Sequence, residues 1–227
     1  MRGPTWQLAE FALAEVRLPD GVAAGISRLL DQAADEFGPP RVQWEPLPLD
    51  GTGIWQRDLS EDAQVEAMLI VSGTAQAAWA LADVRGLLTA AAVGVEAGLR
   101  LRTVLAGRLA EEGWDPAGVS ITCGVALAVS RLLEATVDQA ARSLSIASTQ
   151  AAGLLHEGGT RVAGFQRTRA VANGIEAAEL ACAGLTAPVT GIEGSRGLAA
   201  LQAPGVEITP ICAGLGQIWL LDELVAS

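Results

Sequence analysis

The sequence predicts an all-α protein, and three observations support that prediction. Half of the residues are apolar, mainly Ala, Leu and Val, while aromatic residues make up only 4%. Apolar side chains recur at helical spacing through most of the chain, and short joints containing Gly or Pro separate these segments. Small residues dominate 87–98 and 117–129, and helices of this composition can approach each other closely. A chain of 227 residues fits one domain large enough to bury most of its apolar surface.

The N-terminal part of the chain predicts two helices followed by an irregular segment. Residues 5–38 carry apolar side chains at helical spacing, and the Leu-Pro-Asp-Gly break at 18–21 divides them into two helices. Pro39-Pro40 ends the second helix. Residues 39–60 hold further prolines and glycines beside two tryptophans, and we expect an irregular packed loop there.

The rest of the chain predicts five longer helices and a short tail. The expected helices occupy residues 61–82, 86–111, 117–133, 136–155 and 168–184. Asp138 and Gln139 fit a first helical turn, where a carboxylate interacts favourably with the helix dipole. In the C-terminal tail, 205–227, two short apolar runs indicate a strand followed by a small helix. Together, residues 1–227 are expected to form a single helical domain.

Charge and cysteine usage narrow the partners and the compartment. A net charge of −11 without an Arg-rich stripe argues against nucleic acid, which requires clustered cations. The longest apolar stretch is too short to span a membrane, and the first residues do not resemble a signal peptide. Cys123, Cys182 and Cys212 lack paired spacing and are expected to be small buried residues in a reducing compartment. These observations favour a cytoplasmic protein.

The inventory of reactive side chains restricts the chemistry further. The chain has no Lys and no Tyr, all fifteen basic side chains are Arg, and His156 is the single histidine. Because the chain has no Lys, a Lys nucleophile, a Schiff base and a P-loop lysine are excluded. Arg cannot take over these roles, because it stays protonated. No metal-ligand spacing and no complete nucleotide-binding glycine motif occurs, so we expect neither a metal nor a cofactor. His156 is expected at a helix C-terminus, where a cation interacts favourably with the dipole, rather than in catalysis.

Several short segments occur in an order and spacing typical of one enzyme family. Ser72-Gly73-Thr74-Ala75 is similar to an Asn-Gly-Thr-Ala element, and Gly113-Trp114-Asp115-Pro116 to a Gly-Trp-His-Pro element. Residues 7–12 with Leu18-Pro19, and the stretch from 174 to 188, add to the match. The chain thereby resembles the helical domain of the MmgE/PrpD family, which includes 2-methylcitrate dehydratase and cis-aconitate decarboxylase. The resemblance implies an all-α domain and a homodimer, and we expect the family's second (lid) domain to be absent.

The resemblance fails where the family's acid–base chemistry resides. Asp115 stands in place of the family's His, and Ala163 and Gln166 stand in place of its Lys-x-x-His. Asp83 is the remaining counterpart of an acidic pair. We therefore take Asp115, Gln166 and Asp83 as candidate catalytic residues, although Asp115 also fits a helix N-cap.

The remaining candidates would bind a substrate rather than react with it. Trp79, Trp114 and Phe165 could line a cleft or belong to the core. Arg167 and Arg169 could hold a carboxylate, or lie on a solvated face. Buried Glu96 would require a cationic partner such as Arg100, Arg131 or Arg169.

Three functions follow from these residues. The first is a cofactor-independent transformation of a small-molecule substrate, such as a cyclisation or isomerisation in specialised metabolism, in an apolar cleft beside Asp115 and Gln166. The second is a non-catalytic relative that acts as a binding or assembly partner. The third is weak dehydratase or decarboxylase activity with Asp115 as the only base. A closed or open cavity of about 300–1,000 Å³ beside Asp115 and Gln166 would favour catalysis, whereas a filled one would favour the second function.

Overall fold

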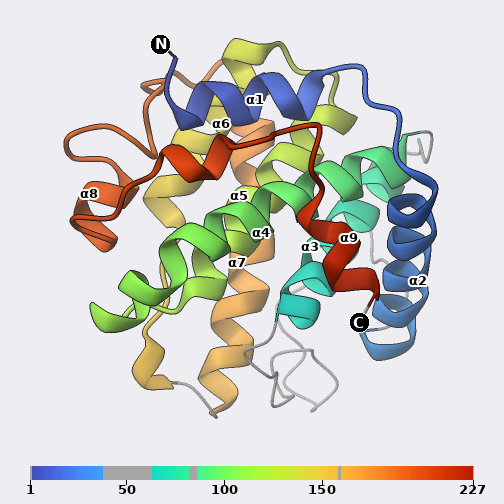
Figure 1. The fold of residues 1–227 in the computed structure, drawn as a ribbon, viewed down its shortest axis with the longest axis horizontal. Coiled ribbons are helices and arrows are strands. Elements are labelled where there is room, and N and C mark those ends of the chain that lie inside the picture. Colours follow the sequence, from blue (N-terminus) through green and yellow to red (C-terminus); the bar gives the residue numbers. More distant parts are fainter. Residues whose placement is uncertain (1, 38–62, 82–85, 158–159, 227) are drawn as a thin grey trace.

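The structure is a computed structural model, and it describes residues 2–37, 63–81, 86–157 and 160–226. Within these ranges the elements are helices joined by turns (Figure 1), so the predicted all-α class is confirmed. In chain order they are α1 (Pro4–Leu13), α2 (Asp20–Phe37), α3 (Ala63–Ala80), α4 (Leu87–Glu111), α5 (Pro116–Leu132), α6 (Val137–Gln150), the 3-10 turn η2 (Leu155–Glu157), α7 (Arg161–Cys182), α8 (Leu198–Gln202), the 3-10 turn η3 (Thr209–Cys212) and α9 (Leu220–Ala226). The irregular loop expected at 39–60 lies outside the described residues.

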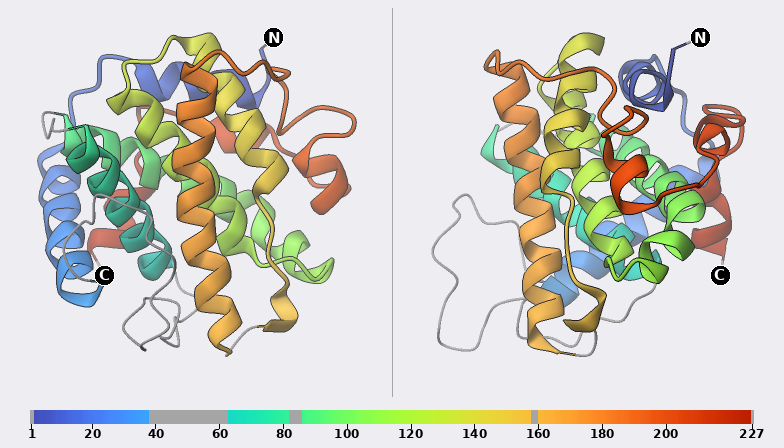
Figure 2. Two further views of the ribbon diagram at one scale, coloured as in Figure 1. Left: turned by 180° about the vertical axis from the view of Figure 1, so that it is seen from behind. Right: turned by 90° about the vertical axis from the view of Figure 1, so that its left-hand side faces the viewer.

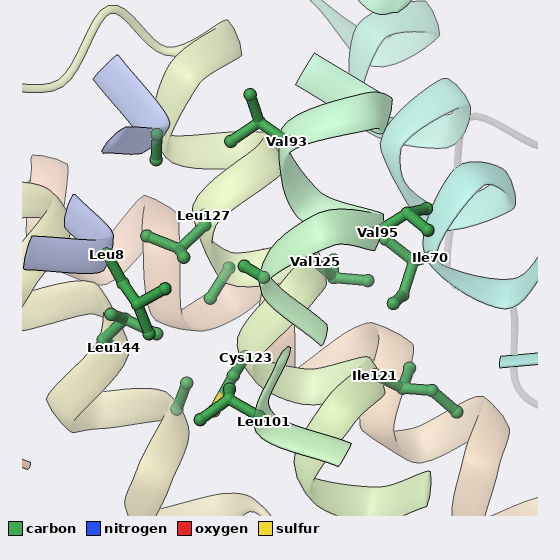
Figure 3. Packing of buried hydrophobic residues seen from close by; sticks show 14 of the residues in the cluster. Leu8, Ile70, Val93, Val95, Leu101, Ile121, Cys123, Val125, Leu127 and Leu144 are labelled. Carbon is green, nitrogen blue, oxygen red and sulfur yellow. The ribbon is translucent and has the colours of Figure 1, made fainter. Parts of the chain in front are cut away.

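Helix α5 forms the centre of the molecule. It contacts α1, α3, α4, α6 and α7, and every residue from Ala117 to Ser130 is buried. A helix that is apolar on all sides must be surrounded in this way. Figure 3 shows Val125 and Leu127 of α5 among side chains from neighbouring helices, including Ile70 of α3. Figure 2 shows α7 on the outer face, beside α6 and α3.

Glycines explain how the helices come so close to α5. A Cβ atom on Gly94 of α4 would lie 2.7 Å from the carbonyl oxygen of Gly124, and a Cβ on Gly124 would lie 2.7 Å from the carbonyl oxygen of Gly94. A Cβ on Gly174 of α7 would lie 2.7 Å from the carbonyl oxygen of Thr122. The backbones therefore touch directly, as the small residues of these segments predict.

Helices α3, α5 and α7 run in the same direction. Near their N-terminal ends, Ser120 of α5 donates a hydrogen bond to Glu66 of α3. In the middle, a Cβ on Gly73 of α3 would lie 2.7 Å from Val171 of α7 and 3.3 Å from Val125 of α5. The bundle consequently has two distinct ends, one where these three helices begin and one where they finish.

A buried ion pair fastens the C-terminal tail to α4. Arg100 Nε donates to Glu96 Oε1 at 2.7 Å, as the sequence predicts. Glu96 also accepts the backbone N–H groups of Leu220 and Leu221, both at 3.1 Å, and thereby caps α9. Arg100 in turn donates to three carbonyl oxygens, those of Ile211, Ala213 and Ile218. The prediction of a strand in this tail is wrong, because the tail forms turns and η3, whose carbonyl groups point toward Arg100. The prediction of a small helix is confirmed by α9.

Two helix boundaries differ from the prediction around residue 155. Helix α6 ends at Gln150, and α7 begins at Arg161 with Thr160 as its N-cap. Between them, Leu154 forms an antiparallel β-bridge with Trp114, so the chain is extended where a helix was expected. His156 lies exposed in η2, and its predicted place at the end of an α-helix is wrong.

Candidate functional site

Asp115 lies at the N-terminal end of α5 and serves as its N-cap. Its Oδ1 accepts the N–H of Ala117 at 3.0 Å, which is the hydrogen bond of an N-cap carboxylate. Its Oδ2 lies 3.5 Å from Nε of Arg167 on α7, and both side chains are buried. Its own N–H donates to the carbonyl of Gly153 at 2.9 Å. Asp115 therefore combines a capping role with a buried ion pair.

Gln166 is bonded to the backbone of the neighbouring segment. Its Oε1 accepts the N–H of Leu154 at 2.6 Å, and its Nε2 lies 3.4 Å from the carbonyl oxygen of Leu154. Gly153 lies between the two candidate residues: a Cβ there would be 3.1 Å from Asp115 Cβ and 3.4 Å from Gln166 Oε1. The structure thus brings both Asp115 and Gln166 close to Gly153.

A further set of polar side chains, from α3, α4 and α5, lies near Asp115. Glu66 of α3 is paired with Arg102 of α4 and accepts a hydrogen bond from Ser120 of α5. Burial raises the pKa of Glu66; Arg102 and Ser120 oppose that shift, while the charge of Asp115 adds to it. Sequence reasoning missed this set. The available signal was a carboxylate one turn before Ile70, on an otherwise apolar helix.

The other candidates fall at both ends of the bundle. Trp114 is half-buried in the bridge to Leu154, and Phe165 is 41% exposed on α7, so both lie at the Asp115 end. Trp79 is 57% exposed near the end of α3. Arg169 is exposed and lines a cavity that neither Asp115 nor Gln166 lines. Asp83 lies outside the described residues.

This cavity lies toward the C-terminal ends of α3, α5 and α7 and has a volume of about 460 Å³. Along α5, Asp115 precedes the lining residues Val129 and Leu133 by roughly 20–27 Å, at about 1.5 Å of rise per residue, whereas Arg169 at the near edge of the cavity follows Arg167 by two residues on α7. Most of its wall is apolar, with Gln76, Arg169, Glu176 and Glu179 as its polar groups. The lining residues are Gln76, Ala77, Ala80, Leu81, Val129, Leu133, Arg169, Ala172, Ile175, Glu176 and Glu179.

The described ranges hold neither a metal site nor a membrane span. No set of three His, Cys, Asp or Glu side chains there is arranged to hold a metal ion. Among the helices of those ranges, none has the length and apolar character needed to cross a membrane.

Comparison with known proteins identifies the family to which this helical domain belongs. The sequence matches the MmgE/PrpD N-terminal domain over residues 60–210, which is most of the chain. The chain belongs to the MmgE/PrpD family. Among curated proteins, no match was found. The matched region includes the three parallel helices, the cavity and Asp115.

Proposed function

We propose that this chain is a binding member of the MmgE/PrpD family, one that holds a small molecule without the family's dehydratase or decarboxylase chemistry. The observation that carries the proposal is the position of Gly153. This residue lies against both Asp115 and Gln166, and both side chains make hydrogen bonds to backbone groups. Because these hydrogen bonds engage both side chains within the protein, they favour binding over reaction at this end of the bundle.

The chemistry of these side chains also argues against proton transfer there. Elimination beside a carboxylate requires an acid or base within hydrogen-bonding reach of the substrate, with a pKa matched to the working pH. Gln166 cannot titrate, and Arg167 stays protonated. Asp115 already faces Ala117 N–H with one oxygen and Arg167 with the other. A proton acceptor held in this way contributes to stability rather than to turnover.

The cavity at the other end of the bundle supports small-molecule binding. Its volume of about 460 Å³ lies within the range of sites that bind small molecules, roughly 300–1,000 Å³. Apolar walls with a few polar groups are typical of such sites. Arg169, a candidate from the sequence, is one of those groups.

A second candidate function uses the same cavity. A cofactor-independent cyclisation or isomerisation needs a substrate held in a folded conformation, and orientation alone can contribute up to about 7–11 kcal/mol in ideal cases. The largely apolar wall favours this candidate. It differs from simple binding in consuming the bound compound.

Two measurements test the proposal. First, concentrated protein is incubated with 2-methylcitrate and with cis-aconitate while the absorbance of the carbon–carbon double bond is followed; we expect no change. Second, a small-molecule panel is screened by thermal unfolding against the wild type and Ala80→Phe, because Ala80 is exposed and lines the cavity. We expect compounds that raise the Tm of the wild type alone.

Each outcome has a defined meaning. Turnover of either tricarboxylate would overturn the proposal, as would a panel in which every compound affects both proteins equally. A stabilising compound that is consumed in molar excess over protein, seen by NMR, would establish the cyclisation or isomerisation candidate instead.

We also propose a homodimer, in line with the family resemblance. Three apolar side chains are exposed near the start of α7, namely Leu154 (55%), Val162 (46%) and Phe165 (41%). A second copy would remove this apolar surface from water. Light scattering should give twice the chain mass for the wild type and a lower mass for Val162→Glu/Phe165→Glu; a monomeric wild type would contradict this.

A further inference from the structure

We infer that the cavity at the ends of α3, α5 and α7 binds an amphipathic amine, a molecule with an apolar body and an ammonium head. The inference rests on the proposed binding function and specifies the class of ligand. Three observations support it: the composition of the walls, the balance of charged side chains, and the direction of the three helices.

The walls fit an apolar body. Ala77 and Ala172 are buried, and Val129, Leu133 and Ile175 add aliphatic surface from α5 and α7. No aromatic side chain is among the lining residues. Such walls favour a saturated chain or ring through the hydrophobic effect, without a specific stacking partner.

The charged side chains at the cavity favour a cation. Glu176 and Glu179 are two exposed carboxylates, against the single guanidinium of Arg169. Arg169 Nη2 already donates to Asn173 Oδ1 at 3.3 Å. Along α7, Arg169 precedes the two carboxylates by about 10 and 15 Å at roughly 1.5 Å of rise per residue. The region toward the helix ends is therefore negative, and Arg169 stands apart from it.

The helix ends strengthen this negative region. The C-terminal ends of parallel helices carry partial negative charge, which a cation in the last turn commonly offsets. Neither α3 nor α7 has a basic residue in its last turn. Arg131, in the last turn of α5, donates to the carbonyls of Ala12 and Ala14 at 2.6 and 2.9 Å, at the end of α1. An ammonium head beside Glu176 and Glu179 would add positive charge to this part of the described structure.

Binding of n-octylamine, n-octanol and octanoate, measured by calorimetry at neutral pH, tests the inference, because the three probes share a chain and differ in the head. We expect octylamine to bind about tenfold more tightly than the other two. Ala80→Phe should abolish its binding. Glu176→Gln/Glu179→Gln should weaken it about three- to tenfold, as expected for two partly solvated charge pairs, and added salt should weaken it further.

The matched control is Glu15→Gln/Asp31→Asn, which removes the same charge from exposed positions on other elements. It should leave octylamine binding unchanged, which separates a local site from attraction to an acidic protein. Octylamine binding no better than octanol, or equal effects of the two double variants, would overturn the inference. Octanol or octanoate binding that Ala80→Phe abolishes would still leave the proposed binding function standing. If no probe binds, the inference fails, and the panel screen decides the binding function separately.

Discussion

Replacing Asp115 tests whether its carboxylate has a structural or a catalytic role. Asn can still cap α5, but it cannot balance the charge of Arg167, whose Nε lies 3.5 Å from Asp115 Oδ2 in a buried environment. Weakening the bonding of a buried charged group costs about 1–3 kcal/mol, so Asp115→Asn should lower the free energy of unfolding by that amount. Asp115→Ala also removes the cap and should cost about 1 kcal/mol more.

Urea denaturation monitored by circular dichroism measures both variants. Thr136→Ala is a suitable control, because Thr136 caps α6 through an exposed capping box without an ion pair and should cost about 1 kcal/mol. Adding Arg167→Met to Asp115→Asn should cost less than the sum of the single changes, since the two side chains interact. A carboxylate kept for reaction rather than for stability would behave differently, because its replacement commonly leaves a protein equally or more stable. An Asp115→Asn variant as stable as the wild type would therefore refute our reasoning.

Three further predictions concern other buried groups. Arg100→Met leaves the carboxylate of Glu96 buried without its cation, so it should lower the free energy of unfolding, measured by urea denaturation, by about 3–5 kcal/mol. It should also speed amide exchange in the C-terminal tail. A loss below about 1 kcal/mol would contradict a stabilising role for the Glu96–Arg100 ion pair. Burial raises the pKa of Glu66 above its ordinary value of 4.5, so the folded protein holds this proton more tightly than the unfolded chain does. The stability of the wild type relative to Glu66→Gln should therefore fall as pH rises from about 4.5 through the raised pKa; parallel pH curves would disprove this. Burial raises the pKa of the Cys123 thiol to about 12, so this thiol should react with Ellman's reagent only after unfolding, whereas immediate labelling of all three thiols would show that it is accessible.

The sequence predicted the long helices well because their signals are local. Small and apolar residues identify α4 and α5, and the break after Leu18 separates α1 from α2. The errors arise where tertiary contacts determine the backbone. The chain around Leu154 is extended because it pairs with the segment containing Trp114, and no local pattern reveals that pairing. The tail forms turns rather than a strand because its carbonyls bond to Arg100, more than a hundred residues away in sequence.

The candidate site was predictable only in part, for the same reason. The family resemblance identified Asp115 and Gln166, and in the structure both side chains lie next to Gly153. Their partners were not predictable, because Arg167 could equally have faced solvent and Glu66 lies on a distant helix. The cavity depends on where three helices end relative to one another, which a single sequence does not specify. Arg169 was identified from its charge alone, and Glu176 and Glu179 were missed because exposed glutamates on a helix are common.

The buried Asp115–Arg167 pair and the cavity lie toward different ends of the bundle. This chain holds Arg167 near the carboxylate of Asp115, and a guanidinium cannot exchange its proton at neutral pH. A fixed positive charge in a buried position is stable only beside a fixed negative one, and Asp115 provides it. Recognition must then rely on shape and on charges that face solvent, and in the described ranges the cavity bordered by Arg169, Glu176 and Glu179 offers both.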